Sequence, residues 1–190
     1  MLQLHTGRWA ALLTALFISA ADAQVDDRVK ACGACHGADG NSTIPGTPSI
    51  AAQPKIFLEN YLVMTREGIR GSPTMQALLK GVPDKEIVGL SDYFSKLKSK
   101  TPEGKTDRNL FNRGKDVASK NRCGSCHLPH FRGREQMPRL AGQREEFLAE
   151  AMLAYRQNRR PGGDTIMAAS LYGIPEADFK ALAHYFSRLK

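Results

Sequence analysis

The sequence predicts an all-α chain built from two copies of one helical unit, and three observations support this prediction. The motif C-x-x-C-H occurs twice, 91 residues apart. The segment 81–98 aligns with the segment 173–190 at an offset of 92. In both copies apolar residues recur at the spacing of an amphipathic helix, and no stretch alternates as a half-buried strand does.

The first 23 residues are expected to be a secretory signal peptide. The apolar stretch from Trp9 to Ala21 is shorter than the roughly 20 residues that a transmembrane helix needs. The segment Ala21-Asp22-Ala23 follows it as a small-x-small cleavage site. An uncleaved N-terminal anchor is the alternative. The mature chain is therefore expected to be exported.

The composition is that of a soluble globular protein, with 42% hydrophobic and 24% charged residues. This excludes a disordered chain and a polytopic membrane protein. The formal charge of +8 is unevenly divided, since residues 24–100 carry 10 basic and 8 acidic side chains, and residues 101–190 carry 16 and 10. We expect an acidic partner to be steered to the second unit, where Arg132, Arg134, Arg139 and Arg144 cluster. A solvated basic face without a special role is the alternative.

Each C-x-x-C-H motif is typical of covalent haem attachment. On a helical turn, positions i, i+3 and i+4 share one face, so two thiols can bond one haem as thioethers while the histidine ligates its iron. The candidate attachment residues are Cys32, Cys35, Cys123 and Cys126, and the candidate iron ligands are His36 and His127. The sequence thus predicts two covalently bound haem c groups.

Three other uses of the cysteines are weighed against haem. A thioredoxin-type pair needs a βαβ context, which the pattern lacks. A zinc ribbon usually separates its two pairs by about 15 to 20 residues, whereas 87 residues lie between Cys35 and Cys123. Structural disulfides would suit an exported protein. None of these explains a histidine directly after both pairs.

Methionine is the candidate for the second ligand of each iron. Met75 aligns with Met167 at an offset of 92, and the two follow His36 and His127 by 39 and 40 residues. We expect each in a loop before the last helix of its unit. The other methionines of the mature chain, which align with no methionine, are Met64, Met137 and Met152.

Two helices of each unit can be placed from the pattern. The last helices are expected to begin at Pro83 and Pro175, with acidic residues in their first turns. A helix upstream is expected around residues 57–62 in one copy and 147–155 in the other. The polar stretch 96–109 is expected to be a linker, with the domains being 24–100 and 101–190. A core in about 80 residues is marginal, so we expect a buried haem in each unit to complete it.

The chain resembles dihaem cytochromes c of the cytochrome c4 type, which are two class I cytochrome c domains in tandem. The resemblance rests on both C-x-x-C-H motifs, on residues 36–42, on Met75 and Met167, and on the Pro-x-(Ile/Leu)-Ala-x-Gln segments 48–53 and 138–143. It covers essentially all of the mature chain. One departure is the segment 127–133, which replaces the glycine-rich loop of the first copy. A second is the short segment between the expected cleavage site after Ala23 and Cys32, which leaves few residues for the first helix.

The resemblance implies periplasmic electron transfer, often to a terminal oxidase, with the haems close together across a domain interface. It implies that Pro48 and Pro138 supply a carbonyl to the ligating histidines. Candidates for the haem propionates are the aligned arginines and two tyrosines, namely Arg70, Arg160, Tyr61 and Tyr155.

We therefore expect an electron carrier and not an enzyme, passing single electrons between a respiratory donor and an acceptor. Its expected partners are acidic redox proteins: an oxidase, a cytochrome bc1-type complex or a dehydrogenase. Nucleic acid is not expected, and peripheral membrane association stays open. The alternative is a dihaem subunit like that of flavocytochrome c sulfide dehydrogenase. Since the chain has no G-x-G-x-x-G element, any flavin would belong to the partner. A haem enzyme would need an open iron.

Overall fold

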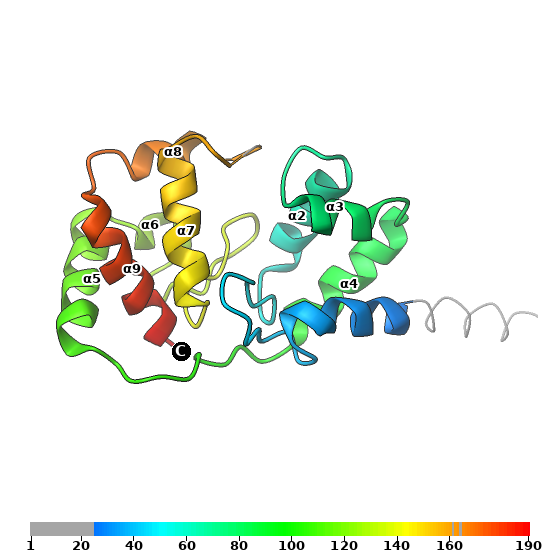
Figure 1. The fold of residues 1–190 in the computed structure, drawn as a ribbon, viewed down its shortest axis with the longest axis horizontal. Helices are drawn as coiled ribbons and strands as arrows, with labels where there is room; N and C mark the ends of the chain where they lie inside the picture. Colours follow the sequence, from blue (N-terminus) through cyan, green and yellow to red (C-terminus); the bar gives the residue numbers. More distant parts are fainter. Residues whose placement is uncertain (1–24, 161, 164) are drawn as a thin grey trace, which may run out of the picture.

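The computed structural model describes residues 25–190 except 161 and 164, so the expected signal peptide lies outside the described residues. Figure 1 shows two groups of helices side by side, joined by an extended segment without helix at residues 97–107. Within the described part of the chain, the only β-structure is an isolated bridge between Arg134 and Met137. The all-α prediction is confirmed.

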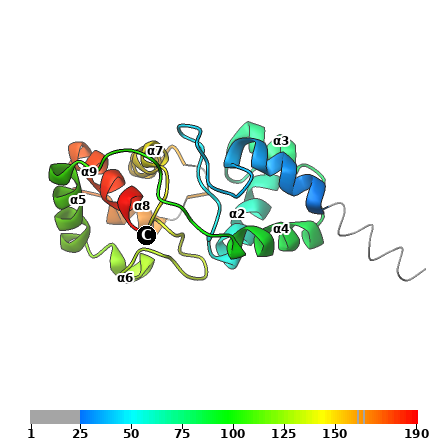
Figure 2. The ribbon, with the colours of Figure 1, turned by 90° about the horizontal axis from the view of Figure 1, so that it is seen from below.

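The two groups have the same order of helices. The first contains a helical segment at 25–36, followed by α2 (Lys55–Arg66), α3 (Pro73–Leu79) and α4 (Asp84–Lys96). The second contains α5 (Arg108–Lys120), α6 (Gly124–His127), α7 (Glu145–Arg156), α8 (Thr165–Ser170) and α9 (Glu176–Arg188). In both views α2 and α7 lie toward the opposite group, whereas α5 lies at the far end of the second group (Figures 1 and 2).

The expected helix starts are nearly correct. Pro83 and Pro175 are the N-caps of α4 and α9, one position before the first helical turn in which the sequence analysis places them. An arginine at the end of α2 or α7 holds each start in place: Arg66 donates to the Val82 carbonyl at 2.7 Å, and Arg156 to the Ile174 carbonyl at 3.0 Å. These bonds fix the chain just after α3 and α8.

The crossing of α5 and α9 is unusually close because it contains a glycine. A Cβ atom built on Gly114 would lie 2.1 Å from the Ala181 carbonyl oxygen, so no side chain fits there. In the corresponding crossing of the first group, Gly89 lies near Val25. A Cβ atom built on Gly89 would lie 3.4 Å from Val25 Cγ2, which is an ordinary van der Waals contact. In both groups the last helix therefore packs against the helical segment that begins the group and leads to the motif.

The loop after the second motif follows the backbone path of the first despite its different sequence. Gly37 and Gly40 have φ of 86° and 73°, and Leu128 and Phe131 take φ of 68° and 54° at the aligned positions. A non-glycine residue in this region costs roughly 1 to 2 kcal/mol. The Phe131 ring, which is 6% exposed and packs in the core of the second group, offsets this cost.

The two cores differ in size. In the first group the buried apolar residues form two small clusters, Leu58, Leu90 and Phe94 in one and Leu79, Val82 and Ile87 in the other. In the second group eleven buried residues form one cluster. Among the described residues, no helix has the length and apolar character needed to cross a membrane.

Candidate haem sites and the domain interface

Both C-x-x-C-H motifs lie on single helical turns, as their spacing predicts. Cys32, Cys35 and His36 end the segment 25–36, and in the second group Cys123 is the N-cap of α6, which contains Cys126 and His127. The first cysteine of each motif is half-buried and the second is exposed. None of the four forms a disulfide, so each motif presents two sulfur atoms beside a histidine.

Burial raises the pKa of the Cys32 and Cys123 thiols; at Cys32 the nearby Arg28 guanidinium opposes this effect. Across the described residues, no three His, Cys, Asp or Glu side chains gather as a metal site would require. The zinc-ribbon alternative therefore finds no support in the structure.

Both motif histidines are held in the orientation that iron ligation requires. His36 and His127 are each 7% exposed, and their Nδ1 atoms lie 2.8 Å from the Pro48 carbonyl and 2.9 Å from the Pro138 carbonyl. Since a carbonyl only accepts, each Nδ1 carries the proton and each Nε2 keeps a lone pair. Burial lowers the pKa of both rings, partly opposed by the proline carbonyls. The neutral imidazoles can therefore serve as metal ligands.

The paired methionines lie in short helices, and the prediction of loops at these positions is wrong. Met75 is in α3, which starts because the Ser72 hydroxyl accepts a hydrogen bond from the Met75 N–H at 3.2 Å and Pro73 follows at the first position. Met167 is in α8. Helices of seven and six residues span fewer than two turns and leave little periodicity in a sequence, so the pattern does not reveal them.

Each methionine packs against an apolar cluster of its own group, and only in the second group does the first cysteine of the motif contact the same cluster. Met167 and Cys123 both pack against the single cluster of the second group. In the first group Cys32 contacts one small cluster and Met75 the other, and Leu62 contacts both. Met152, by contrast, is 5% exposed in the core of the second group, which is a packing role.

Two arginines between the groups form no ion pair with any carboxylate of the described residues. Arg70 lies over the rings of Tyr61 and Tyr155, at 5.0 and 5.9 Å from their centroids, and donates to the Tyr155 hydroxyl. Arg160 lies over Tyr155 and Phe147 at 4.9 and 5.7 Å. The Nε atoms of both arginines are buried without a hydrogen-bond partner, and no described carboxylate forms an ion pair with either.

Both arginines are half-buried, and a buried charged donor without a partner is costly, so this cluster suits an anionic group that would pair with the two Nε atoms. Haem carries two propionates, and the sequence analysis proposed these same arginines and tyrosines for them. Together with the thiols and the neutral imidazoles, the donor set fits haem c in both groups.

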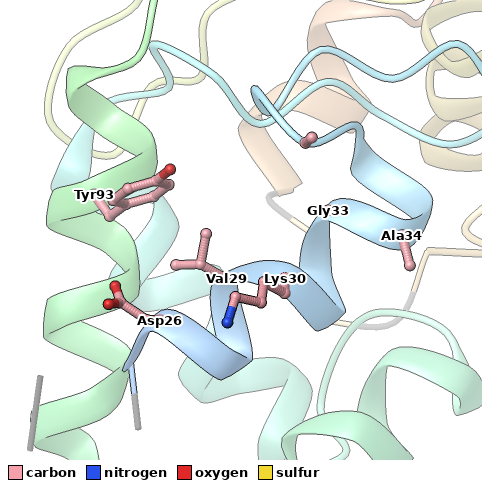
Figure 3. A pocket seen from close by; sticks show the side chains of 7 residues that line it. Asp26, Val29, Lys30, Gly33, Ala34 and Tyr93 are labelled. Atoms are coloured by element: carbon pink, nitrogen blue, oxygen red, sulfur yellow. The ribbon is translucent and has the colours of Figure 1, made fainter. Parts of the chain in front are cut away.

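An open hollow of about 540 Å³ lies on the opposite side of the first motif and is not part of this site. Figure 3 shows its lining by Asp26, Val29, Lys30, Gly33, Ala34 and Tyr93. Gly33 and Ala34 are the two intervening residues of the motif, so the hollow faces away from Cys32, Cys35 and His36. A similar hollow of about 380 Å³ accompanies the second motif, lined in part by Gly124, Ser125 and Tyr185.

Two glutamines that the sequence analysis left without a role connect the groups. Gln53 donates to the Arg139 carbonyl at 3.0 Å and accepts from the Arg139 N–H at 2.9 Å. Gln143 donates to the Ser49 carbonyl at 2.8 Å and accepts from the Ser49 N–H at 2.7 Å. The only signal in the sequence is that both end a Pro-x-(Ile/Leu)-Ala-x-Gln segment, which does not reveal what the amide contacts.

Comparison with known proteins gives related results at the level of family, sequence and structure. Residues 111–190 match the cytochrome c family. "Cytochrome c4" of Pseudomonas aeruginosa is 31% identical, and the match covers 93% of each chain. "Thiosulfate dehydrogenase electron acceptor" of Stutzerimonas stutzeri is 28% identical over 95% of this chain and 92% of that one.

The solved structures agree with these matches. The crystal structure of reduced recombinant cytochrome c4 from Pseudomonas stutzeri superposes with a TM-score of 0.80 at 28% identity, covering 88% of this chain and 97% of that chain. The similarity therefore extends over both groups of helices and is not confined to one motif.

Proposed function

The chain belongs to the cytochrome c4 family, and from that premise we propose that it is a dihaem electron carrier of the periplasm. It carries two covalently bound haem c groups. The observation that best supports the proposal is that the same ligand arrangement occurs twice, each time with a buried neutral histidine held by a proline carbonyl. One such site per domain suits the passage of single electrons through the molecule.

We propose the domain division 24–100 and 101–190, with one haem in each domain. Cys32 and Cys35 form the thioethers in the first domain, and Cys123 and Cys126 form them in the second. His36 with Met75, and His127 with Met167, would ligate the two irons. When bound, haem supplies an iron that alternates between the ferric and ferrous states.

The protein residues keep the iron closed and set its surroundings. The proline carbonyls hold the imidazoles by their Nδ1–H groups, and the methionines close the other side. The apolar clusters exclude water from the site. Arg70 and Arg160 at the interface supply positive charge for the propionates.

A carrier differs from a haem enzyme in having no open iron position. We therefore expect the oxidised holoprotein to take up two electrons per chain, the reduced holoprotein to keep its spectrum unchanged under carbon monoxide, and the protein to oxidise no thiosulfate by itself. Spectroelectrochemistry with gas addition measures the first two, and a thiosulfate assay with an artificial acceptor measures the third. Carbon monoxide binding at both wild-type irons, or thiosulfate turnover, would contradict the carrier function.

A second candidate function is that of an electron acceptor attached to a dehydrogenase. It is favoured by the 28% identity to the thiosulfate dehydrogenase electron acceptor of Stutzerimonas stutzeri. Copurification from the native host separates the two functions, because a subunit stays with its dehydrogenase through size-exclusion chromatography and a carrier does not.

We further propose that an acidic redox partner docks on the second domain. Of the four arginines near the second motif, Arg132 and Arg134 are exposed and form no ion pair with a described residue. Arg144 instead pairs with Glu146, and Arg139 is half-buried with its Nε donating to the Ala141 carbonyl. The burial of Arg139 and the charge of Arg132 lower its pKa. Arg132 and Arg134 are therefore the free charges of this surface.

Replacing Arg132 and Arg134 together by Glu is expected to slow electron transfer with the acidic partner about 10-fold or more at low salt, because steering by several charges raises association rates by roughly 10 to 1,000-fold. The difference should vanish near 1 M salt, where the Debye length is about 3 Å. Stopped-flow kinetics measures both. Lys80→Glu with Lys85→Glu makes the same charge change on the first domain, at exposed positions, and serves as the control. Equal slowing by both double variants would refute docking on the second domain.

A further inference from the structure

The two interdomain glutamines are related by the repeat and contact equivalent residues. Gln53 and Gln143 are 5% and 4% exposed. Each uses its amide oxygen and its amide nitrogen on the same residue of the other domain, Arg139 in one case and Ser49 in the other. Because both ends of each amide are engaged, the orientation of the side chain is fixed.

The peptide groups that these glutamines bind are the ones that hold the histidines. The Ser49 N–H and the Pro48 carbonyl belong to one peptide group, and its N–H donates to Gln143 Oε1 at 2.7 Å. Its carbonyl accepts from His36 Nδ1 at 2.8 Å. In the second domain the Arg139 N–H donates to Gln53 Oε1 at 2.9 Å, and the Pro138 carbonyl accepts from His127 Nδ1 at 2.9 Å.

Hydrogen bonds that share one peptide group reinforce each other. The C–N bond has partial double-bond character, so an acceptor on the N–H increases the negative charge of the carbonyl oxygen. That oxygen then binds the Nδ1–H more strongly. A stronger bond at Nδ1 makes the imidazole a more basic ligand and fixes the orientation of its ring.

We propose that Gln143 positions and tunes His36, and that Gln53 positions and tunes His127, so that each domain sets the iron ligand of the other. The inference rests on the proposed ligation of the irons by these histidines. A more basic histidine stabilises ferric iron and lowers the reduction potential of its haem. Loss of either glutamine is therefore expected to raise the potential of the haem in the opposite domain.

The test uses the holoprotein and replaces each glutamine by methionine, which has a similar length but cannot accept from the peptide N–H. Potentiometry followed by NMR resolves the two haems, whose resonances are assigned through contacts with their own cysteines. Gln143→Met should raise the potential of the first haem and shift the His36 Nδ1–H resonance, and Gln53→Met should do the same for the second haem and His127. This crossed pattern supports the proposal.

The reciprocal variants control for simple loosening of the interface. Loosening would change the reduction potentials of both haems together in either variant. Gln143→Glu gives a second test, because a carboxylic acid or carboxylate still offers an oxygen to the Ser49 N–H. In Gln143→Glu, the reduction potential of the first haem should therefore be equal to or lower than that of the wild type. Equal shifts of both haems, a shift only in the mutated domain, unchanged potentials, or the same rise with Glu as with Met would each overturn the proposal.

The result is separable from the function of the chain. The carrier function is judged on the wild-type protein, by its response to carbon monoxide. If the wild type binds no carbon monoxide and the glutamine variants have unchanged reduction potentials, the tuning proposal is overturned and the carrier function still stands.

Discussion

Replacing Met75 or Met167 by Ala is expected to open one iron to carbon monoxide while the other stays closed. Each methionine is proposed as an axial ligand, and alanine has no group that can take its place. Methionine ligation raises the reduction potential, so the potential of the altered haem should also fall, by on the order of 0.1 V within the roughly 0.8 V that axial ligands span. Carbon monoxide difference spectra and potentiometry measure the two effects.

The remaining methionines supply matched controls. Met64 and Met137 are half-buried, align with no methionine of the other domain and are not proposed as ligands. Met64→Ala and Met137→Ala should therefore leave both spectra and both potentials unchanged. If either control opened an iron, or if Met75→Ala and Met167→Ala bound no carbon monoxide, the ligand assignment would be wrong. A pyridine haemochrome count of two haems per chain verifies that each variant is fully loaded.

Removing the thioether cysteines is expected to affect the first domain more severely than the second. The described part of the first domain buries two clusters of three apolar residues, whereas the second buries eleven in one cluster. Each fully buried large side chain contributes about 1.5 to 3 kcal/mol. The first domain therefore depends more on the apolar contact that haem provides.

Cys32→Ala with Cys35→Ala should abolish the cooperative unfolding transition of the first domain and make residues 25–96 sensitive to protease. Cys123→Ala with Cys126→Ala should leave the second domain partly structured. Urea unfolding and limited proteolysis of the two double variants, expressed with a cytochrome c maturation system, make the comparison. Expression of the wild type without that system should give an unfolded chain, and recovery of a folded, haem-free protein would contradict the dependence on haem.

Much of the fold and the attachment motifs could be predicted from the sequence because they depend on local spacing. The apolar periodicity predicts α2, α4, α7 and α9, and the C-x-x-C-H spacing alone requires the thiols and the imidazole to share a helical turn. The offset of 92 relates Met75 to Met167 before any coordinates are known. The residual errors, such as the loops expected at α3 and α8, concern helices of seven and six residues.

What only the tertiary structure decided is how the two copies meet. No local pattern shows that Gln143 reaches Ser49, 94 residues away, or that Arg70 donates to Tyr155, 85 residues away. The sequence also does not reveal that the loops after the two motifs follow the same backbone path. Leu128 and Phe131 adopt positive φ angles, which sequence patterns predict only for glycine. Periodicity reports the face that a residue presents within its own element. The partner on that face is set by the packing of distant elements, which depends on the whole chain.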